Sequence, residues 1–201
     1  MNAVYKKSVF INAAKVAHLT YQIGESDLLR KKSMPLNIKK ISSLKTRSLV
    51  TKLKTTLLEY KKLTGKGRGI AAVQIGVPIK IAVLFIGNDL ETIINPKVIK
   101  KSSKLLTYPE ICMSANPVIA RVIRPSWIEV EYFDEKGVKK TWKRKDKTRQ
   151  NLVLNRVIQH EIDHLEGIIN IDLVKPGELI LDSDPNYFKQ AEFVTHKETG
   201  P

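Results

Sequence analysis

Two histidines four residues apart, His160 and His164, constrain this 201-residue chain more than any other feature. The residues between them are Glu-Ile-Asp, so the pattern reads H-E-x-x-H. Side chains four residues apart lie on one face of a helix, so both histidines can bind one metal ion. Glu161 follows the first histidine and can then reach a water molecule on that metal. The pattern therefore indicates a helix that carries a metal site and a carboxylate base.

The helix around this pattern has clear ends. Asp146 or Thr148 can cap its start, and Gly167 can close it after Leu165. Four strands are expected before it, over residues 79–86, 92–95, 127–133 and 138–145. Strands followed by one central helix predict an α+β domain, in which antiparallel β-sheets pack around the helix that carries H-E-x-D-H.

An amphipathic helix is expected earlier in the chain, over residues 41–63. Ser42 or Ser43 can cap its start, and Gly65 can end it. The short strand over residues 92–95 should stop at the proline that follows it. The basic N-terminal residues predict a terminal helix or a disordered arm, and the polar C-terminal residues predict a short helix and a loose tail.

Composition limits the kinds of partner. The net charge is +15, and the basic residues gather in the ranges 30–54, 97–104 and 139–149. They form either a solvated lysine-rich surface or a basic face that approaches RNA. Aromatic residues are too scattered in these ranges for a base-stacking platform, and nothing indicates sequence-specific DNA binding. No apolar run is long enough for a membrane span.

A metal site of this kind needs a third protein ligand. The candidates downstream are Glu166, Asp172 and Glu178, although Glu166 falls on the wrong side of the helix. The candidate upstream is Cys112, the only cysteine of the chain. A lone cysteine excludes an intrachain disulfide and fits a reducing compartment. It is either a small buried apolar residue or, beside a paired-histidine pattern, a metal ligand.

Three ordered motifs make the chain resemble the peptide deformylase family. Residues 67–74 read GRGIAAVQ and are similar to the family's G-x-G-[IL]-A-A-x-Q. Residues 110–114 read EICMS, against E-G-C-[LIM]-S, and residues 159–164 read QHEIDH, against Q-H-E-x-D-H. Residues 26–30 and 94–96 also resemble family segments. The likeness covers roughly residues 24–175, which predicts a catalytic domain there with extensions over residues 1–23 and 176–201.

The resemblance implies an activity: hydrolysis of the N-formyl group from the initiating formylmethionine of nascent polypeptides. It assigns one divalent metal ion to Cys112, His160 and His164, with water in the fourth place. Iron(II) would be the physiological metal, while zinc, nickel and cobalt suit the same ligands. Glu161 would transfer protons between that water and the leaving amine.

The resemblance also implies the groups around the substrate. The side chain of Gln74 and the backbone N–H of Met113 would bind the oxyanion, although a glutamine there could also cap a loop and a methionine could belong to the core. Three residues of the first motif would contact the peptide, its glycines allowing close backbone approach: Gly67, Arg68 and Gly69. From helix geometry, Val157 should line the pocket for the methionine side chain. Glu110 and Asp163 would support the histidines or the loop.

One residue departs from the family pattern. Ile111 stands where the family has glycine, and isoleucine cannot comfortably adopt positive φ. Either the chain is extended at this position or the site is reshaped. A stiff side chain there is expected to narrow the cleft beside the second substrate residue.

Two other functions stay open at this stage. A zinc endopeptidase would use a downstream third ligand and would not need Cys112. A catalytically impaired relative could be a binding protein that docks on ribosomal RNA through its lysines. The compartment would be the cytoplasm, or a mitochondrion or plastid if residues 1–23 are a transit peptide.

Overall fold

The structure, a computed structural model, describes residues 7–181 and 191–196. Its main elements are α1 (Lys7–Ala17), α2 (Leu44–Thr64), β1 (Gly69–Ala71), β2 (Ile81–Ile86), β3 (Asp89–Lys101), β4 (Leu105–Ile111), β5 (Val118–Pro125), β6 (Ile128–Phe133), β7 (Lys139–Lys143), α3 (Arg149–Leu165), β8 (Leu179–Leu181) and β9 (Val194–Thr195). Two short 3-10 helices matter for the site, η3 (Ala72–Ile75) and η4 (Met113–Ala115). Within the described ranges, no helix combines the length and apolar character that crossing a bilayer requires.

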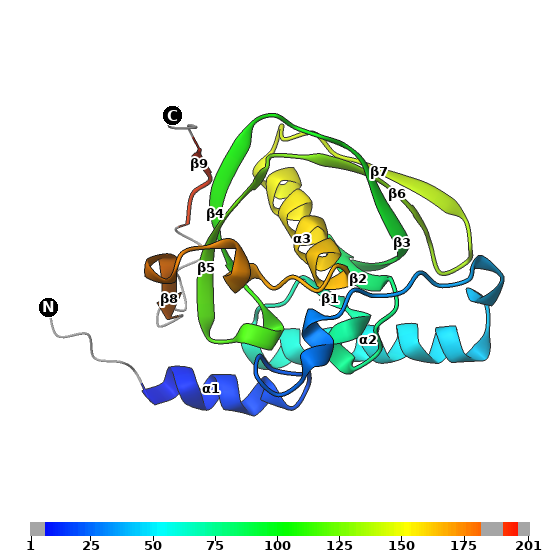
Figure 1. Ribbon diagram of the computed structural model, residues 1–201, viewed down its shortest axis with the longest axis horizontal. Helices are drawn as coiled ribbons and strands as arrows, with labels where there is room; N and C mark the ends of the chain where they lie inside the picture. The colour runs from blue at the N-terminus through cyan, green and yellow to red at the C-terminus, as the bar shows by residue number, and fades with distance from the viewer. Residues whose placement is uncertain (1–6, 182–190, 197–201) are drawn as a thin grey trace, which may run out of the picture.

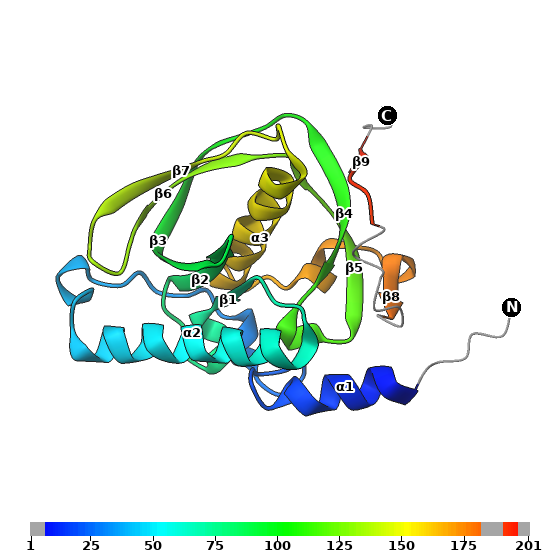
Figure 2. The same ribbon diagram turned by 180° about the vertical axis from the view of Figure 1, so that it is seen from behind.

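The strands form two antiparallel sheets. One has the order β1-β2-β3-β6-β7, and the other has the order β8-β5-β4-β9. Figures 1 and 2 show α3 between these sheets, with β4 and β5 along one side and β3, β6 and β7 along the other. The long α2 packs against β1 and β2. This arrangement confirms the predicted α+β fold with antiparallel sheets around the helix that carries the histidines.

The helix α2 follows its sequence pattern. Its buried residues, among them Val50, Leu53, Leu57 and Tyr60, recur at helical spacing and pack in the main core. Ser43 caps the start by accepting a hydrogen bond from the backbone N–H of Thr46. Gly65, with φ of 69°, ends the helix in the left-handed conformation that glycine adopts without strain. The helix begins three residues later than expected, because Ile41 lies in the turn before the cap.

The strand β3 corrects one prediction. A strand over residues 92–95 was expected to stop at Pro96, but β3 continues to Lys101. Its pairing with β6 shifts register between Ile94 and Lys97, and Asn95 in this interval has φ of 51°. Proline lacks the N–H that a regular ladder needs, but a bulge removes that requirement. The irregularity therefore accommodates Pro96 within one long strand.

The strands β4 and β5 were not expected, although they carry one side of the site. They pair along their whole lengths, from Leu105 with Pro125 to Ile111 with Ile119. Part of the expected short C-terminal helix lies outside the residues that the structure describes. The described parts of that region form β8, which pairs with β5, and β9, which pairs with β4.

Candidate metal centre and active site

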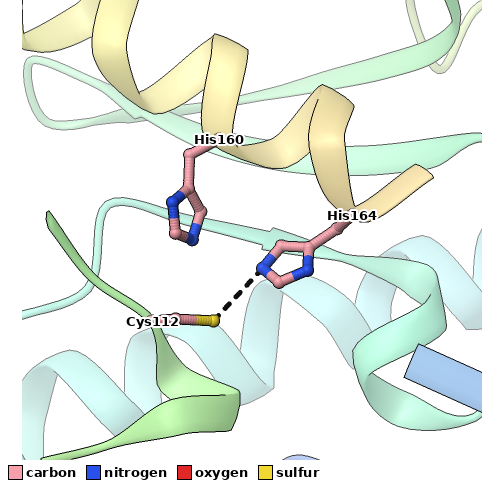
Figure 3. Close-up of side chains that lie close together, drawn as sticks. All are labelled: Cys112, His160 and His164. Carbon is pink, nitrogen blue, oxygen red and sulfur yellow. Dashed lines mark hydrogen bonds between the residues drawn. The ribbon is translucent and has the colours of Figure 1, made fainter. Parts of the chain in front are cut away.

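Three side chains from two elements converge at one point. Cys112 follows β4 directly, and His160 and His164 lie one turn apart on α3. One ligand atom from each lies within 4.8 Å of the other two. Figure 3 shows both rings turned toward the cysteine, whose Sγ lies 3.2 Å from Nε2 of His164. Residue spacing left the third ligand open, the family resemblance assigned it to Cys112, and the structure brings Cys112 to the histidine pair.

The chemistry of this cluster fits a divalent transition metal. One thiol and two imidazoles are ligands for zinc, iron, cobalt or nickel. The Nδ1 atom of His160 is 2.9 Å from Oε2 of Glu110, so its Nε2 is left to face the cluster. A carboxylate behind a histidine fixes the ring orientation and strengthens the ligand. Because Cys112 and His164 are almost fully buried, the cluster is shielded from competing solvent.

The helix α3 sets the spacing of the two histidines. Thr148 caps it by accepting a hydrogen bond from the backbone N–H of Asn151, as one of the two expected caps. The helix ends at Leu165, and Gly167 follows with φ of 80°. Both ends therefore match the prediction. Seventeen residues of helix place the histidine face toward β4.

Glu110 lies at the centre of a buried ion network. Its carboxylate accepts hydrogen bonds from Nε and Nη2 of Arg124 at 2.7 and 3.0 Å and from Arg156 at 3.1 Å. Arg124 also donates to Asp163 at 2.5 Å. Burial alone would raise the pKa of Glu110, but the charge of Arg124 and the hydrogen bonds from His160 and Arg124 hold this pKa well below its usual range. The ionised carboxylate therefore stays fixed behind His160.

The two arginines of this network are the site residues that sequence reasoning missed. Arg124 lies on β5 and Arg156 on α3, one turn before His160. Arg156 also donates to the backbone carbonyls of Leu106 and Val122, at 2.7 and 3.0 Å. One signal could have revealed Arg156. It lies one turn before His160 on the same face of a helix that was expected at the centre of the fold, where a charged residue needs a partner.

Glu161 is buried beside the cluster, so it is not a solvated helix residue. Only 4% of it is exposed, and its Oε2 makes no hydrogen bond to any residue in the described ranges. Burial raises its pKa to about 7. A Cβ atom added at Gly69 would lie 2.8 Å from Cγ and Cδ of Glu161 and closer still to Oε1. Gly69 was expected to admit the substrate, but in this structure it also leaves room for Glu161.

Gln74 reaches the cluster from η3. Its Oε1 accepts a hydrogen bond from the backbone N–H of Ala71 at 2.9 Å. Its Nε2 is 3.1 Å from Oγ of Ser114 and 3.8 Å from Sγ of Cys112. Gln74 therefore both caps a local turn and directs an amide N–H toward the cysteine. Met113 follows that cysteine, and its side chain packs in the main core while its backbone starts η4.

The remaining substrate-binding candidates lie around this centre. Gly67 has φ of 89°, which explains glycine there, and the side chain of Arg68 is exposed. Val157 is half-buried and packs against the hydrophobic core beneath the five-stranded sheet. Ile111 ends β4 and pairs with Ile119. Of the two expected possibilities, an extended chain or a reshaped site, the structure shows the extended chain. Side chains alternate along a strand, which puts Ile111 on the face opposite to Cys112.

The downstream carboxylates are engaged elsewhere. Glu166 pairs with Lys32 and Lys80, at 2.6 and 2.5 Å. Asp172 pairs with Arg30 and accepts a hydrogen bond from the backbone N–H of Ile169. The backbone N–H of Lys175 donates to Glu178 at 3.0 Å. None of the three belongs to the cluster, which counts against the downstream third ligand that the endopeptidase alternative requires.

Comparisons with known proteins agree with the site. The model of the polypeptide deformylase family matches residues 20–179. Peptide deformylase 2 of Prochlorococcus marinus (strain MIT 9313) is 38% identical over 135 residues, which are 63% of this chain and 63% of that protein. The match thus spans a little under two thirds of that relative. Peptide deformylase 2 of Clostridium acetobutylicum is 33% identical over 153 residues, 76% of this chain and 93% of that protein.

A solved structure extends the likeness to three dimensions. The crystal structure of peptide deformylase from Ehrlichia chaffeensis in complex with actinonin is 26% identical to this chain, with a TM-score of 0.68. The likeness covers 79% of this chain and 88% of that one. The region matched by the family model contains all three residues of the cluster. This chain belongs to the polypeptide deformylase family.

Proposed function

We propose that this chain is a metal-dependent peptide deformylase, which hydrolyses the N-formyl group of formylmethionine at the start of nascent polypeptides. The observation that carries the proposal is the convergence of Cys112, His160 and His164 within 4.8 Å, in a chain of this family. The buried carboxylate of Glu161 beside this cluster supplies the base that amide hydrolysis needs.

Cys112, His160 and His164 would hold one divalent metal ion, with iron(II) as the physiological metal and zinc, nickel or cobalt as substitutes. Such an ion supplies Lewis acidity toward the formyl carbonyl and lowers the pKa of water. Glu110 orients His160 through the 2.9 Å contact to Nδ1. Arg124 keeps that carboxylate ionised and in place.

Glu161 accepts a proton from the attacking water and later donates it to the leaving amine. Its pKa near 7 suits both directions of transfer at neutral pH. The amide N–H of Gln74 and the backbone N–H of Met113 stabilise the negative charge that develops on the formyl oxygen. The peptide lies extended along the backbone of Ile111, with Gly67, Arg68 and Gly69 on its other side and Val157 at its first side chain.

The partners we propose are formylated nascent chains and the ribosome that presents them. Exposed basic residues on α2 and on the outer part of β3 offer a surface for phosphates: Lys45, Arg47, Lys52, Lys97, Lys100 and Lys101. The corresponding compartment is the cytoplasm, or an organelle if residues 1–23 are removed as a transit peptide.

The decisive experiment is anaerobic purification, metal analysis and an assay of formate release from formyl-Met-Ala-Ser. We expect one metal ion per chain and a single cleavage, at the formyl group. Glu161→Gln should keep the metal and lose about 10²–10⁴-fold of the turnover. A metal-loaded wild type that releases no formate would favour the binding-protein alternative. Cleavage at an internal peptide bond, detected by mass spectrometry, would favour the endopeptidase.

A further inference from the structure

Residues 20–23, called the tether below, form hydrogen bonds to both of the short helices that carry the proposed oxyanion donors. The backbone N–H of Tyr21 donates to the carbonyl of Gln74 in η3 at 2.8 Å. The backbone N–H of Ile23 donates to the carbonyl of Ser114 in η4 at 2.9 Å. Because an extended chain repeats every two residues, one short segment can direct both N–H groups to the same side.

The two helices belong to different sheets. η3 follows β1 of the five-stranded sheet, whereas η4 follows β4 of the four-stranded sheet. The two sheets share no strand within the described ranges, so strand pairing does not set the distance between the helices. One direct bond joins them, from Nε2 of Gln74 to Oγ of Ser114 at 3.1 Å. The tether adds backbone bonds that link the same two helices without using the catalytic side chain of Gln74.

The side chain of Gln22 fastens the tether to η4. Its Nε2 atom faces the carbonyls of Ala17, Thr20 and Met113 at 3.3, 3.0 and 3.3 Å, and Oγ1 of Thr20 at 3.1 Å. The hydroxyl of the buried Thr20 donates to the same Met113 carbonyl at 3.4 Å. The amide of Gln22 has two N–H groups, which these four oxygens share. Because all four oxygens can accept, the position suits a hydrogen-bond donor.

Met113 is thereby held at two points. Its side chain packs in the main core, and its carbonyl is bound by the tether. The backbone N–H of the same residue is a proposed oxyanion donor, and such a donor must lie about 2.7–3.1 Å from the oxyanion. A bound carbonyl limits rotation of the backbone on either side of Met113. The bond to the carbonyl of Gln74 likewise fixes the backbone from which the second donor extends.

We propose that the tether positions the two oxyanion donors, and that Gln22 is the positioning residue within it. This inference rests on the proposed function, because the oxyanion is the one that forms from the formyl group. Gln22 acts through Met113 and does not touch the substrate. The extension predicted over residues 1–23 would then contribute its last four residues to the active site.

The test measures kcat and KM for formyl-Met-Ala-Ser with metal-loaded full-length variants. Gln22→Met has a side chain of similar length without N–H groups, so kcat should fall about tenfold, less than the roughly 10²–10³-fold cost of removing an oxyanion donor outright. KM should stay within about twofold, because the negative charge develops only in the transition state. Gln22→Lys restores N–H donors among the four oxygens, so it should recover most of the kcat that Gln22→Met loses.

A second variant and a control complete the design. Thr20→Val removes the other side-chain donor to the Met113 carbonyl, so adding it to Gln22→Met should lower kcat further. Gln150→Met, the same substitution at an exposed residue in the first turn of α3, is the matched control and should leave kcat and KM unchanged. Metal content and melting temperature are measured for every variant, because a purely structural role would lower the melting temperature and leave kcat intact.

The outcomes separate this inference from the proposed function. No formate release by the metal-loaded wild type would overturn both. With an active wild type, an unchanged kcat in Gln22→Met would overturn the role of the tether alone. A rise in KM at constant kcat would also overturn it, because the side chain would then serve substrate binding. Gln22→Lys as slow as Gln22→Met would refute the donor role, and loss of metal from Gln22→Met would mean that the tether supports the metal ligands instead.

Discussion

The contact between Gly69 and Glu161 predicts a large effect from the smallest possible substitution. In Gly69→Ala the new Cβ atom would lie 2.8 Å from Cγ and Cδ of Glu161, whereas carbon atoms in contact normally lie about 3.5–4.0 Å apart. Glu161 must therefore move by about 0.7–1.2 Å. A misplacement of this size costs on the order of 10²-fold in rate, or about 2.7 kcal/mol. The ceiling is about 10⁴-fold, reached if the carboxylate no longer transfers protons.

The substitution should leave the fold and the metal in place. Gly69 has no positive φ and lies in the paired strand β1, opposite Leu84, so alanine fits its backbone. Overpacking of the neighbouring side chain costs about 1–3 kcal/mol of the free energy of unfolding. The matched control is Gly177→Ala, because a Cβ atom there meets no atom within 4 Å and its φ is not positive.

The assay measures kcat and KM for formyl-Met-Ala-Ser on the anaerobically prepared, metal-loaded protein. A displaced Glu161 lowers kcat and leaves KM within a few-fold, because only the transition state is affected. If Gly69 serves only the close approach of the substrate backbone, KM should rise while kcat holds. Turnover of Gly69→Ala within threefold of wild type, with metal bound, would refute the reasoning about Glu161.

Four further predictions address the ligands, the ion network, the strand end and the charged surface. Cys112→Ala should lose metal and turnover together, because three protein ligands are needed for an occupied site; full metal content by elemental analysis would contradict this. Arg124→Met should lower the free energy of unfolding in urea by about 3–5 kcal/mol, because it leaves the buried Glu110 and the partly buried Asp163 without their main cation; a loss below about 1 kcal/mol would show that Arg156 suffices. Ile111→Gly should leave the preference for the second substrate residue unchanged across a formyl-Met-X-Ser panel, because the Ile111 side chain lies on the face away from Cys112; a broader profile would mean that it borders the cleft. Co-sedimentation with ribosomes should fall steeply with added salt while peptide turnover hardly changes; absence of binding at low salt would return the +15 charge to an ordinary solvated surface.

The features that sequence predicted are those with a local signal. The caps and glycine stops of α2 and α3 lie within a few residues of the helices that they bound, so both helices were located closely. The strands β4 and β5 lacked such a signal. β4 contains Pro109, a residue that argues against a strand. It is held by pairing with β5, the next strand along the chain, and with β9, which lies far from it in the sequence. The course of β3 past Pro96 depended in the same way on a bulge that only its partner strand defines.

In the candidate site, too, some residues could be predicted from sequence and others could not, for a chemical reason. Only a few kinds of atom bind a metal, so His160 and His164 leave a recognisable pattern at helical spacing, and the family motif adds Cys112. The groups behind them obey a weaker rule, which is charge balance. The buried Glu110 and the partly buried Asp163 need nearby cations, but any strand or helix that passes close by can supply them. Here β5 supplies Arg124, and α3 supplies Arg156.

The same reasoning places Phe193 beyond the reach of a sequence pattern. Its position depends on the two-residue strand β9, which pairs with the edge of β4. A strand of that length has too few residues to show an alternating pattern in the sequence. Its ring stacks on Tyr108, on the face of β4 that also carries Glu110. Motifs therefore predict the groups proposed to react, whereas the position of Phe193 follows only from the pairing of β9 with β4.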